Sequence, residues 1–492
     1  MPATLDETYE RTLREIEETK WESARQLLFC VAVASHPLRV EELAEILAYD
    51  FKSGAIPKFH KDWRLKNPVE AVLSACSTLL SIVDIETYSE TSKVVQFTHF
   101  TVKEFLTSSR FAEKHDSISG RYHISMSSAH TFVAQVCLGM LLHLDEKITS
   151  RSLAEFPLAE YAAEHWFEHA RFENASQDAV EGMKLLFDRA KPHFSIWLWI
   201  CNPTETVPYW KRHQRAEVPS PPCGTPLHYA AFCGLHEIAK ILAIEHPQDV
   251  NSQGFDNAAS PLHLALHEGH VDLAQMLVEC GVDVSTQNED GSTALHLALE
   301  NDHIDLARVL VERGTNVSAQ KKDGSTVLHL ALGNGRVDLA LMLVERGADV
   351  SPKDKYGSTA LQVALEQHHV DIARMLIEHG ADVSAENARM LTPLQLVSCD
   401  GHVGLARMLM EWGADPSAQT KDGWTALHFA SLNGHVDLIR MLVEHDTDIS
   451  AQTKDGWTPL HLASQHGYTD LTRMLVGPRA DSADISAQTK GE

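Results

Sequence analysis

From residue 225 onward, apolar and polar positions recur with a fixed period. A Thr or Ser is followed by a small or apolar residue, Leu, and His or Gln; the first interval between copies is 35 residues and each later one is 33. Two apolar stripes with helical spacing follow each copy, separated by a turn that usually holds Gly. This period predicts a stack of eight helix–turn–helix units. The copies begin at Thr225, Ser260, Thr293, Thr326, Thr359, Thr392, Thr425 and Thr458.

The last copy shows why each unit folds locally. The Thr458 hydroxyl can cap the first helix, Pro459 suits its first position and Leu460 is expected to face the core. Gly467 is expected to end that helix, and Asp470 lies in the first turn of the second helix, where negative charge is favourable. A further Gly is expected to end the second helix in most units, before a polar Asp-Gly hairpin. These residues are Gly281, Gly314, Gly347, Gly380 and Gly413, with Asp323-Gly324 and Asp422-Gly423 as examples of the hairpin.

No unit can bury its apolar face alone, because Leu306, Ala307, Val309 and Leu310 of one unit need the helices of the next. The His of each signature could suggest a ladder of metal ligands. Spaced one repeat apart, these side chains are instead expected to bond to neighbouring backbone. They are His228, His263, His296, His329, His428 and His461.

Some units depart from the pattern. The sixth has Met390 at the hairpin Gly position, Gln395 for the signature His and Gly404 for the acid of the second helix, and the fifth has His368 for Gly. We expect these units to be bent or locally weak. The tail Ser486–Lys490 begins the hairpin phrase again, so the array ends without a polar capping repeat. The expectation is that the natural chain is longer or that a partner covers this end.

The N-terminal half has a different pattern. Helices are predicted near Ala24–Ala34, Val40–Ala48 and Val69–Leu80, followed by strands Ile82–Tyr88 and Val94–Phe97 and a helix Thr101–Ser108. Three helices, a hairpin and a helix make a winged-helix arrangement. The predicted groove helix Val69–Leu80 has no Lys or Arg and the hairpin offers only Lys93, which argues against DNA binding.

Two resemblances follow from these residues. The repeated unit resembles the ankyrin repeat, over about residues 223–492. Leu5–Leu13, Pro37–Ala44, Phe97–Leu106 and Leu158–Trp166 resemble the segment after the nucleotide-binding module in fungal NACHT-ankyrin proteins, a branch of the STAND NTPases related to NOD-like receptors. That resemblance implies a receptor in which nucleotide binding drives assembly while the repeats sense a partner. No Gly-x-x-x-x-Gly-Lys-Ser/Thr loop occurs in the chain, so the NTPase activity is not carried over to any residue.

The formal charge of −26 is uneven: residues 1–222 hold 24 Lys+Arg against 31 Asp+Glu, and residues 223–492 hold 18 against 37. This field disfavours nucleic acid and membranes as partners and makes a basic protein surface the better candidate, although an acidic surface kept for solubility is the simpler explanation. The eight cysteines form no Cys-x-x-Cys pair and suggest free thiols in a reducing compartment. The N-terminus is expected to be too charged for a secretory signal, and the longest apolar run, Val133–Leu144, too short to span a bilayer. A cytoplasmic protein is expected, with the nucleus not excluded.

One segment of the chain matches a catalytic pattern. His165-Trp-Phe-Glu168-His169 matches the His-x-x-Glu-His pattern of inverted zinc peptidases, but Tyr161, Ala162, His165 and Trp166 also fit an ordinary amphipathic stripe. We expect the stripe. With no nucleophile elbow and no cysteine motif, the chain is expected not to be an enzyme, and no catalytic, cofactor or metal residue is assigned.

Ankyrin arrays usually present hairpin tips and the ends of first helices on one concave face, so the resemblance names a partner surface. Its sharpest feature is the pair Trp424 and Trp457, one repeat apart; whether they face a partner or pack against the next repeat is left open. The full set is Asp290, Ser292, Glu300, Asn301, Asp323, Ser325, Asn334, Tyr356, Glu366, Gln367, Asp422, Trp424, Leu432, Asn433, Asp455, Trp457, Gln465 and His466.

The sequence therefore predicts a mostly α protein. A helical lead-in (1–20), a winged-helix-like domain (21–125) and a helical connector (126–222) precede eight ankyrin repeats (223–492), the last hairpin incomplete. The expected function is a non-enzymatic interaction scaffold or sensor-adaptor that binds protein partners, with self-assembly left open and no cofactor. The alternative is a fragment of a nucleotide-driven STAND NTPase whose NTPase module lies upstream of Met1.

Overall fold

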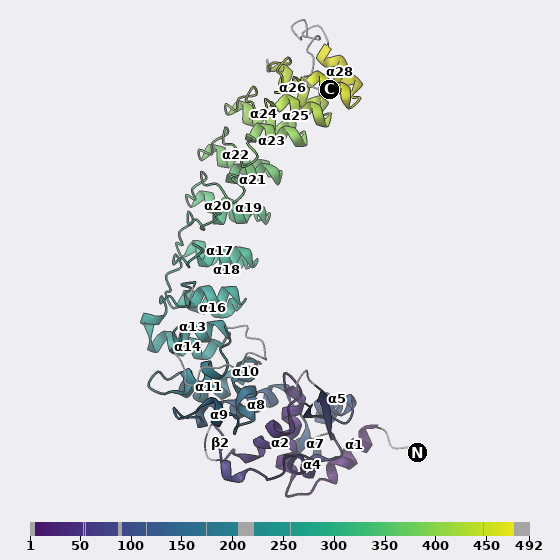
Figure 1. The fold of residues 1–492 in the computed structure, drawn as a ribbon, viewed down its shortest axis with the longest axis vertical. Coiled ribbons are helices and arrows are strands. Elements are labelled where there is room, and N and C mark those ends of the chain that lie inside the picture. Colours follow the sequence, from purple (N-terminus) through teal and green to yellow (C-terminus); the bar gives the residue numbers. More distant parts are fainter. Residues whose placement is uncertain are drawn as a thin grey trace. The chain divides into compact units, whose positions relative to one another are not determined.

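The computed structural model describes residues 5–52, 54, 56–86, 91–114, 116–173, 175–204, 221–255, 257–445 and 447–476. Their regular structure is mostly helical, and the described strands form two short antiparallel hairpins (Figure 1). The chain divides into two compact units, Met1–Val282 and Asp283–Glu492. The mostly α fold class predicted from the repeat period is confirmed. The predicted tail motif Ser486–Lys490 lies outside the described residues.

A winged-helix domain begins the first unit. Its hairpin pairs Leu80 with Phe97 and Ile82 with Val95, and the buried side chains are Leu80, Val94 and Val95. Each predicted element is present with its boundaries shifted by a few residues. The elements are α2 (Trp21–Val33), α3 (Val40–Glu45), the 3-10 turn η1 (Ile46–Ala48), α4 (Pro68–Cys76), β3 (Leu80–Glu86), β4 (Thr91–Phe97) and α5 (Phe100–Thr107).

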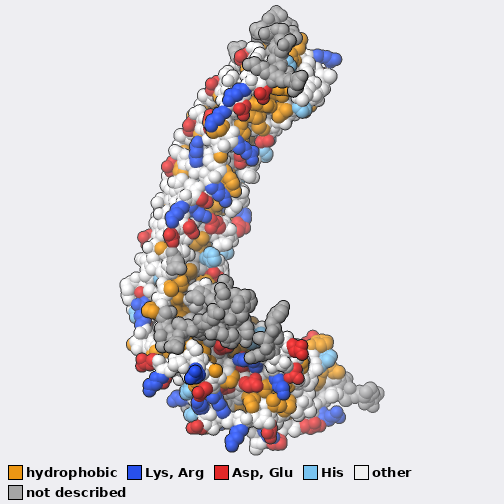
Figure 2. All heavy atoms as spheres, viewed as in Figure 1, with side chains coloured by type: hydrophobic (Ala, Val, Ile, Leu, Met, Phe, Trp, Pro, Cys, Tyr) orange, Lys and Arg blue, Asp and Glu red, His pale blue; other side chains and the backbone are white. Residues whose placement is uncertain are grey.

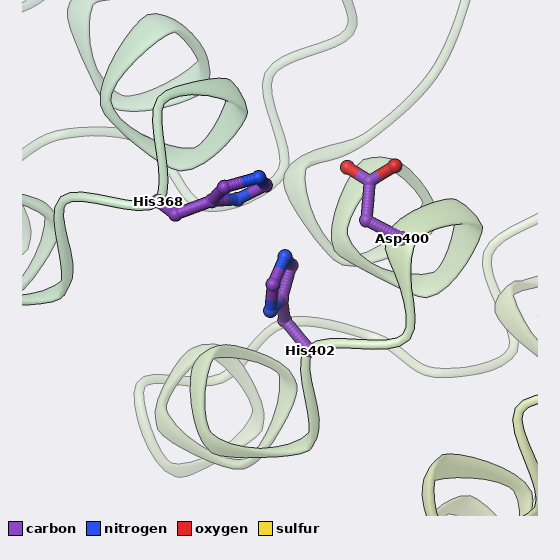
Figure 3. Close-up of side chains that lie close together, drawn as sticks. All are labelled: His368, Asp400 and His402. Carbon is purple, nitrogen blue, oxygen red and sulfur yellow. The ribbon is translucent and has the colours of Figure 1, made fainter.

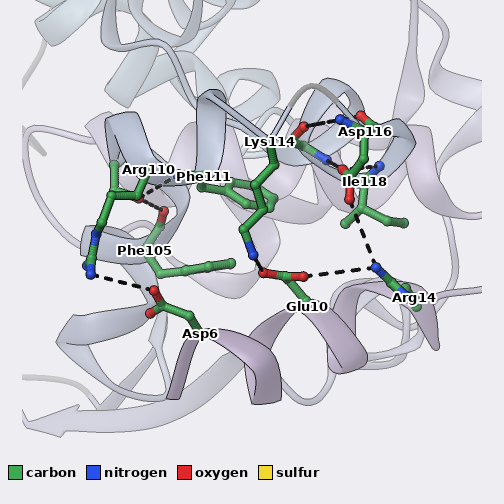
Figure 4. A network of polar contacts seen from close by, with 11 residues as sticks. Asp6, Glu10, Arg14, Phe105, Arg110, Phe111, Lys114, Asp116 and Ile118 are labelled. Carbon is green, nitrogen blue, oxygen red and sulfur yellow. Dashed lines mark hydrogen bonds and ion pairs between the residues drawn. The ribbon is translucent and has the colours of Figure 1, made fainter. Parts of the chain in front are cut away.

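The lead-in helix α1 (Leu5–Arg14) packs onto this domain. Leu13 is buried, and the Tyr9 hydroxyl lies 2.6 Å from Oγ1 of Thr101 on α5. Charged side chains along α1 face the segment that follows α5 (Figure 4). The ion pairs are Asp6 with Arg110, Glu10 with Lys114, and Arg14 with Asp116. Asp116 also caps the helix α7 (Ser117–Tyr122), which links the two helices through one carboxylate.

The helical connector is built around α8 (Met126–His143). The stretch Ser117–His143 is long and apolar enough to cross a membrane by length and composition, so the expectation that this region is too short was wrong on that count. However, 56% of its most apolar window is buried inside the protein, where α10 and α11 pack against it. The apolar side chains therefore serve a protein core. The remaining elements are β1 (Tyr49–Asp50), β2 (Lys58–Phe59), α6 (Ser109–Ala112), α9 (Ser150–Leu153), α10 (Leu158–Ala170), α11 (Ala175–Leu186) and α12 (His193–Ile200).

The connector covers the open side of the first repeat. Phe194 and Trp197 of α12 meet Tyr229 edge-on, with ring centroids 5.4 Å and 6.2 Å apart, and Arg189 forms an ion pair with the buried Asp249. A first repeat has no preceding repeat to bury its apolar face, so this contact supplies an N-terminal cap. The helices of the first two repeats are α13 (Pro226–Phe232), α14 (His236–Glu245), α15 (Pro261–His267) and α16 (Val271–Glu279).

The second unit continues the array with one helix pair per repeat (Figure 1). Leu306, Ala307 and Leu310 are fully buried between helices, as predicted, and Val309 is half-buried. The Gly residues that end the second helices are left-handed, with φ between 82° at Gly347 and 92° at Gly413. The pairs are α17 (Ala294–Glu300) and α18 (Ile304–Glu312), α19 (Val327–Gly333) and α20 (Val337–Glu345), α21 (Ala360–Glu366) and α22 (Val370–Glu378), α23 (Pro393–Asp400) and α24 (Val403–Glu411), α25 (Ala426–Asn433) and α26 (Val436–Glu444), and α27 (Pro459–Gln465) and α28 (Thr469–Val476).

The hairpins between repeats are shorter than the predicted β-hairpins. The second unit shows only isolated bridges among its described residues, Gln320 with Thr326 and Lys353 with Thr359. The Asp-Gly turns hold their shape through left-handed glycines, such as Gly324 at φ 91°, and through side-chain bonds such as that from the Ser325 amide to Oδ1 of Asp323. Each tip is therefore a turn fixed by local bonds, and it projects from the helix stack.

Candidate protein-binding surface

The signature Thr and His residues set the register of the surface. In the seventh repeat the Thr425 hydroxyl lies 2.8 Å from Nδ1 of His428, and Nε2 of His428 lies 3.2 Å from the Trp457 carbonyl of the next repeat. His228 and His329 reach the Ala259 and Ser358 carbonyls in the same way. For these repeats the expectation that the signature His bonds to neighbouring backbone is confirmed. Burial lowers the pKa of His428, which favours the neutral ring that these bonds need.

The repeats expected to be weak keep the same connections. Gln362 and Gln395 replace the signature His in the fifth and sixth repeats, and their side-chain amides donate to the Leu391 and Trp424 carbonyls at 3.2 Å. Met390, in place of the hairpin Gly, adopts φ 60°, which is a strained conformation for a side chain of this size. The connections between repeats are preserved and the strain is confined to the turns.

The hairpin tips form the first row of the candidate surface. Asp290, Asp323, Tyr356, Asp422 and Asp455 are exposed there, as expected. Ser292 and Ser325 are not: they are 3% and 8% exposed. These serines directly precede the capping Thr of the first helix, and the chain turns inward at that point. Their selection as contact residues was wrong, because the tip ends one residue earlier.

The ends of the first helices form the second row. The exposed members are Glu300, Asn301, Asn334, Glu366, Gln367, Asn433, Gln465 and His466, whereas Leu432 is half-buried. Two of the asparagines are committed to the fold: the Asn334 side-chain amide donates to the Leu299 carbonyl and that of Asn433 to the Cys399 carbonyl, both at 3.1 Å. These two hydrogen bonds join neighbouring repeats. Glu300 pairs with the Lys321 ammonium at 2.6 Å, whereas Glu366, Gln367 and Gln465 present exposed side chains.

The paired tryptophans are half-buried rather than prominent. The Trp424 ring lies 5.2 Å from that of Phe429 and 5.9 Å from that of His428, and the Trp457 ring lies 6.1 Å from that of His461. Both rings therefore contact the first helix of their own repeat. Their carbonyls accept the bonds from Gln395 and His428, so these positions serve the stack as well as the surface.

Two other aromatic side chains of the second unit are more exposed. Tyr356 was selected from the sequence and is 65% exposed, with the Lys355 ammonium 5.1 Å from its ring centroid. Trp412, 47% exposed, was missed. It follows α24 at a position where other repeats carry Arg313, Arg346 and His379. A polar residue there in other repeats was the signal that this position faces solvent.

Charges alternate along the tips. Lys322 pairs with Glu289 at 3.8 Å and Lys454 with Asp422 at 3.7 Å, in each case with the acid in the preceding repeat. Figure 2 shows Lys and Arg side chains interspersed with Asp and Glu along the repeats. The acidic excess of the C-terminal half is thus not concentrated on the tips. A partner would be oriented by local charge pairs more than by one acidic field.

The zinc-peptidase pattern is not assembled as a metal site. His169 is 1% exposed; its Nδ1 lies 2.9 Å from Nδ1 of His130 and its Nε2 lies 2.9 Å from the Tyr161 hydroxyl. His165 Nδ1 instead contacts Glu168 at 2.9 Å. Burial lowers the pKa of His169 to about 3. Because both nitrogens of His169 have protein partners, these residues belong to the connector core.

The helix that would enter a DNA groove has few charged residues. The helix α4 carries Glu70 as its one charged residue, with no Lys or Arg among Pro68–Cys76. A helix that enters the major groove needs donors and cations for base edges and phosphates. This part of the winged-helix domain therefore offers no basic recognition face.

Comparisons with known proteins agree with this architecture. A family model of three ankyrin repeats matches in overlapping windows at residues 227–321, 262–354, 313–387, 351–420 and 394–489, and the model of the GPI inositol-deacylase winged helix domain matches residues 9–117. The azaphilone pigments biosynthesis cluster protein L of Monascus ruber is 28% identical over 295 residues, 58% of this chain and 60% of that protein. Alpha-latrocrustotoxin-Lt1a of Latrodectus tredecimguttatus is 34% identical over 65 residues, 13% of this chain and 4% of the toxin.

The chain spans less than two thirds of the length of either relative. The ankyrin matches, in contrast, extend over more than half of this chain, and stacked repeats of this kind point to protein–protein interactions. The helix pairs, the capped signatures and the matched windows agree in register from residue 227 to the end of the described repeats. On this ground the chain belongs to the ankyrin-repeat family.

Proposed function

We propose that this protein is a non-enzymatic scaffold or sensor-adaptor that binds another protein through the hairpin tips and first-helix ends of its repeats. The observation that carries the proposal is the exposure of Tyr356 at the tip of the fifth repeat, with Glu366 and Gln367 exposed at the end of the helix that follows. A large aromatic side chain beside polar groups has the composition of a binding hot spot.

Several features support a protein as the partner. The tips alternate in charge, and the turns that carry them are held by bonds to their own backbone, so little conformational freedom is lost on binding. The helix α4 has no cation for nucleic acid. The exposed Glu366 and tip aspartates would meet basic groups of a partner, one local charge pair at a time. We place this activity in the cytoplasm, as the free cysteines suggest.

The test is an affinity capture from a cell extract with the full chain, because the connector caps the first repeat. Tyr356→Ala is compared with the parent and with Trp412→Ala, an exposed aromatic residue at the end of a second helix. We expect Tyr356→Ala to lose the partner and Trp412→Ala to keep it. Equal capture by all three proteins would contradict the proposal. The double variant Trp424→Ala, Trp457→Ala tests the second aromatic site after its helicity has been checked by circular dichroism.

A second candidate is favoured by the winged-helix match at residues 9–117, a domain type associated with NACHT proteins. Under this hypothesis the chain is the regulatory part of a STAND NTPase, a class of protein related to NOD-like receptors. The discriminating observation is the genomic reading frame upstream of Met1. An in-frame phosphate loop supports the nucleotide-driven switch, and its absence supports the adaptor.

A further inference from the structure

Three side chains that no part of the proposed function uses converge at the junction of the fifth and sixth repeats. They are His368, Asp400 and His402, and one ligand atom from each lies within 4.8 Å of the others (Figure 3). His368 lies in the turn after α21, Asp400 ends α23, and His402 is the N-cap of α24. Within the part of the chain that the structure describes, this is the single such group of three metal-ligating side chains.

The convergence has a cause in the repeat. We call the left-handed residue between the two helices of a repeat the turn position; it is Gly234, Gly269, Asp302, Gly335, His368, Gly401, Gly434 or Gly467, all with positive φ. At the sixth repeat the N-cap of the next repeat's second helix packs on this position, because a Cβ added at Gly401 would come 2.5 Å from Nδ1 of His435. The approach varies along the array, since a Cβ added at Gly269 or Gly335 would have nothing within 4 Å. At the third and fifth repeats the turn position has a side chain, and that side chain reaches the N-cap residue of the next repeat.

The third and fifth repeats both depart from Gly at the turn position, with different results. Asp302, at φ 60°, forms an ion pair with Arg336, so the junction is satisfied by opposite charges. His368, at φ 61°, meets His402 with ring centroids 4.1 Å apart. Two imidazoles cannot form an ion pair as Asp302 and Arg336 do, and the carboxylate of Asp400 lies beside them.

The rings of this pair lack a bond that two other N-cap histidines make to the backbone of the preceding repeat. At equivalent N-caps, Nε2 of His270 lies 3.1 Å from the Phe232 carbonyl and Nε2 of His435 lies 2.9 Å from the Cys399 carbonyl. For His402 and His368 the ring nitrogens make no hydrogen bond to the described residues. His368 and Asp400 are exposed and His402 is half-buried, so the donor atoms are accessible from solvent.

We propose that His368, Asp400 and His402 bind a Zn²⁺ ion that fastens the turns of the fifth and sixth repeats together. Two imidazoles and one carboxylate suit a borderline divalent cation such as Zn²⁺ and disfavour Ca²⁺ and Mg²⁺, which take oxygen ligands. Bonds of about 2.0–2.2 Å to a tetrahedral ion place ligands about 3.3 Å apart. The donor atoms must therefore move together by about 1 Å, which rotation of exposed side chains allows. Three protein ligands leave the fourth position for water or another group from solution.

The array itself supplies substitutions that preserve the fold. His368→Gly restores the residue found at most turn positions and relieves a left-handed side chain. Asp400→Asn introduces the residue that stands at the equivalent position in Asn301, Asn334 and Asn433. Asp302→Gly is the matched control, because it makes the same kind of change at a turn position distant in sequence from the three ligands.

The experiment measures Zn²⁺ bound to the untagged full chain by equilibrium dialysis and isothermal titration, after removal of metal with a chelator. We expect the parent and Asp302→Gly to bind one more equivalent than His368→Gly, and Asp400→Asn to bind at that site at least tenfold more weakly. Co²⁺ gives a second readout: its visible ligand-field bands should appear in the parent, be displaced by Zn²⁺, and be absent in His368→Gly. The same stoichiometry and affinity in all four proteins would overturn the proposal.

Discussion

The indole of Trp197 meets the phenol ring of Tyr229 edge-on, with centroids 6.2 Å apart and planes at 68°, and this contact joins the helical connector to the first ankyrin repeat. Trp197 is fully buried, and its Nε1 donates to the Ala163 carbonyl at 2.9 Å. The connector thus buries the open face of the first repeat, as each repeat buries the face of the next.

Removing the indole should destabilise the connector and the first repeat together. Trp197→Ala is expected to cost about 3–5 kcal/mol, because a large buried side chain leaves a cavity. Trp197→Phe should cost less, about 1–3 kcal/mol, since it keeps an aromatic ring in the core and removes the bond to the Ala163 carbonyl, which retains its helical donor within α10. Urea unfolding followed by circular dichroism measures both. Trp412→Ala, at an exposed position, should stay within about 0.5 kcal/mol of the parent; a similar loss there would show that the effect is not specific to the interface.

The signature His should be replaceable by Gln but not by Leu. His428 contacts Thr425 and the Trp457 carbonyl, and Gln362 and Gln395 make comparable bonds in neighbouring repeats. His428→Leu removes the bond to the Trp457 carbonyl, which keeps the Thr453 amide as a donor at 2.9 Å, and leaves the Thr425 amide without its acceptor; we expect a cost of about 1–2 kcal/mol in urea unfolding. His428→Gln should lose less than half of that. If both variants unfold at the same urea concentration, the hydrogen bond to the next repeat contributes little.

Left-handed glycines should differ according to what surrounds them. Gly324 and Gly347 have φ 91° and 82°, but a Cβ on Gly324 would collide with the Lys353 carbonyl oxygen, whereas nothing lies within 4 Å of one on Gly347. Gly347→Ala is expected to lose about 1–2 kcal/mol from the conformation alone. Gly324→Ala should lose more, because the backbone of the next hairpin must also move. Equal losses measured by urea unfolding would mean that the hairpins are free to separate.

Stability should fall as the solution becomes mildly acidic. Burial lowers the pKa of His228, His329 and His428 in the folded chain, and that of His169 to about 3. The unfolded chain binds protons on these rings below about pH 6.5 while the folded chain does not. The urea midpoint should therefore decline from about pH 6.5 downward, towards the lowered pKa values. His428→Gln removes one such group, and the slope for that variant should be shallower; a midpoint that rises on acidification would contradict this account.

The repeat period, the order of the helices and the winged-helix elements could all be predicted from the amino-acid pattern. Capping Thr, turn Gly and apolar stripes act over a few residues, so their consequences are readable along the chain. The same local logic placed most of the tip and helix-end residues on the surface. Because the signature His residues are spaced one repeat apart, the pattern also favoured hydrogen bonds to neighbouring backbone over a ladder of metal ligands.

Which side chains meet between repeats depends on how the repeats stack and could not be predicted from the pattern. Ser292 and Ser325 are buried because the tip ends before them, and Trp424 and Trp457 are half-covered by their own first helices. The meeting of His368 with His402 depends on how one turn packs on the next N-cap. Such contacts join residues of successive repeats through the geometry of stacking, which a one-dimensional pattern does not contain.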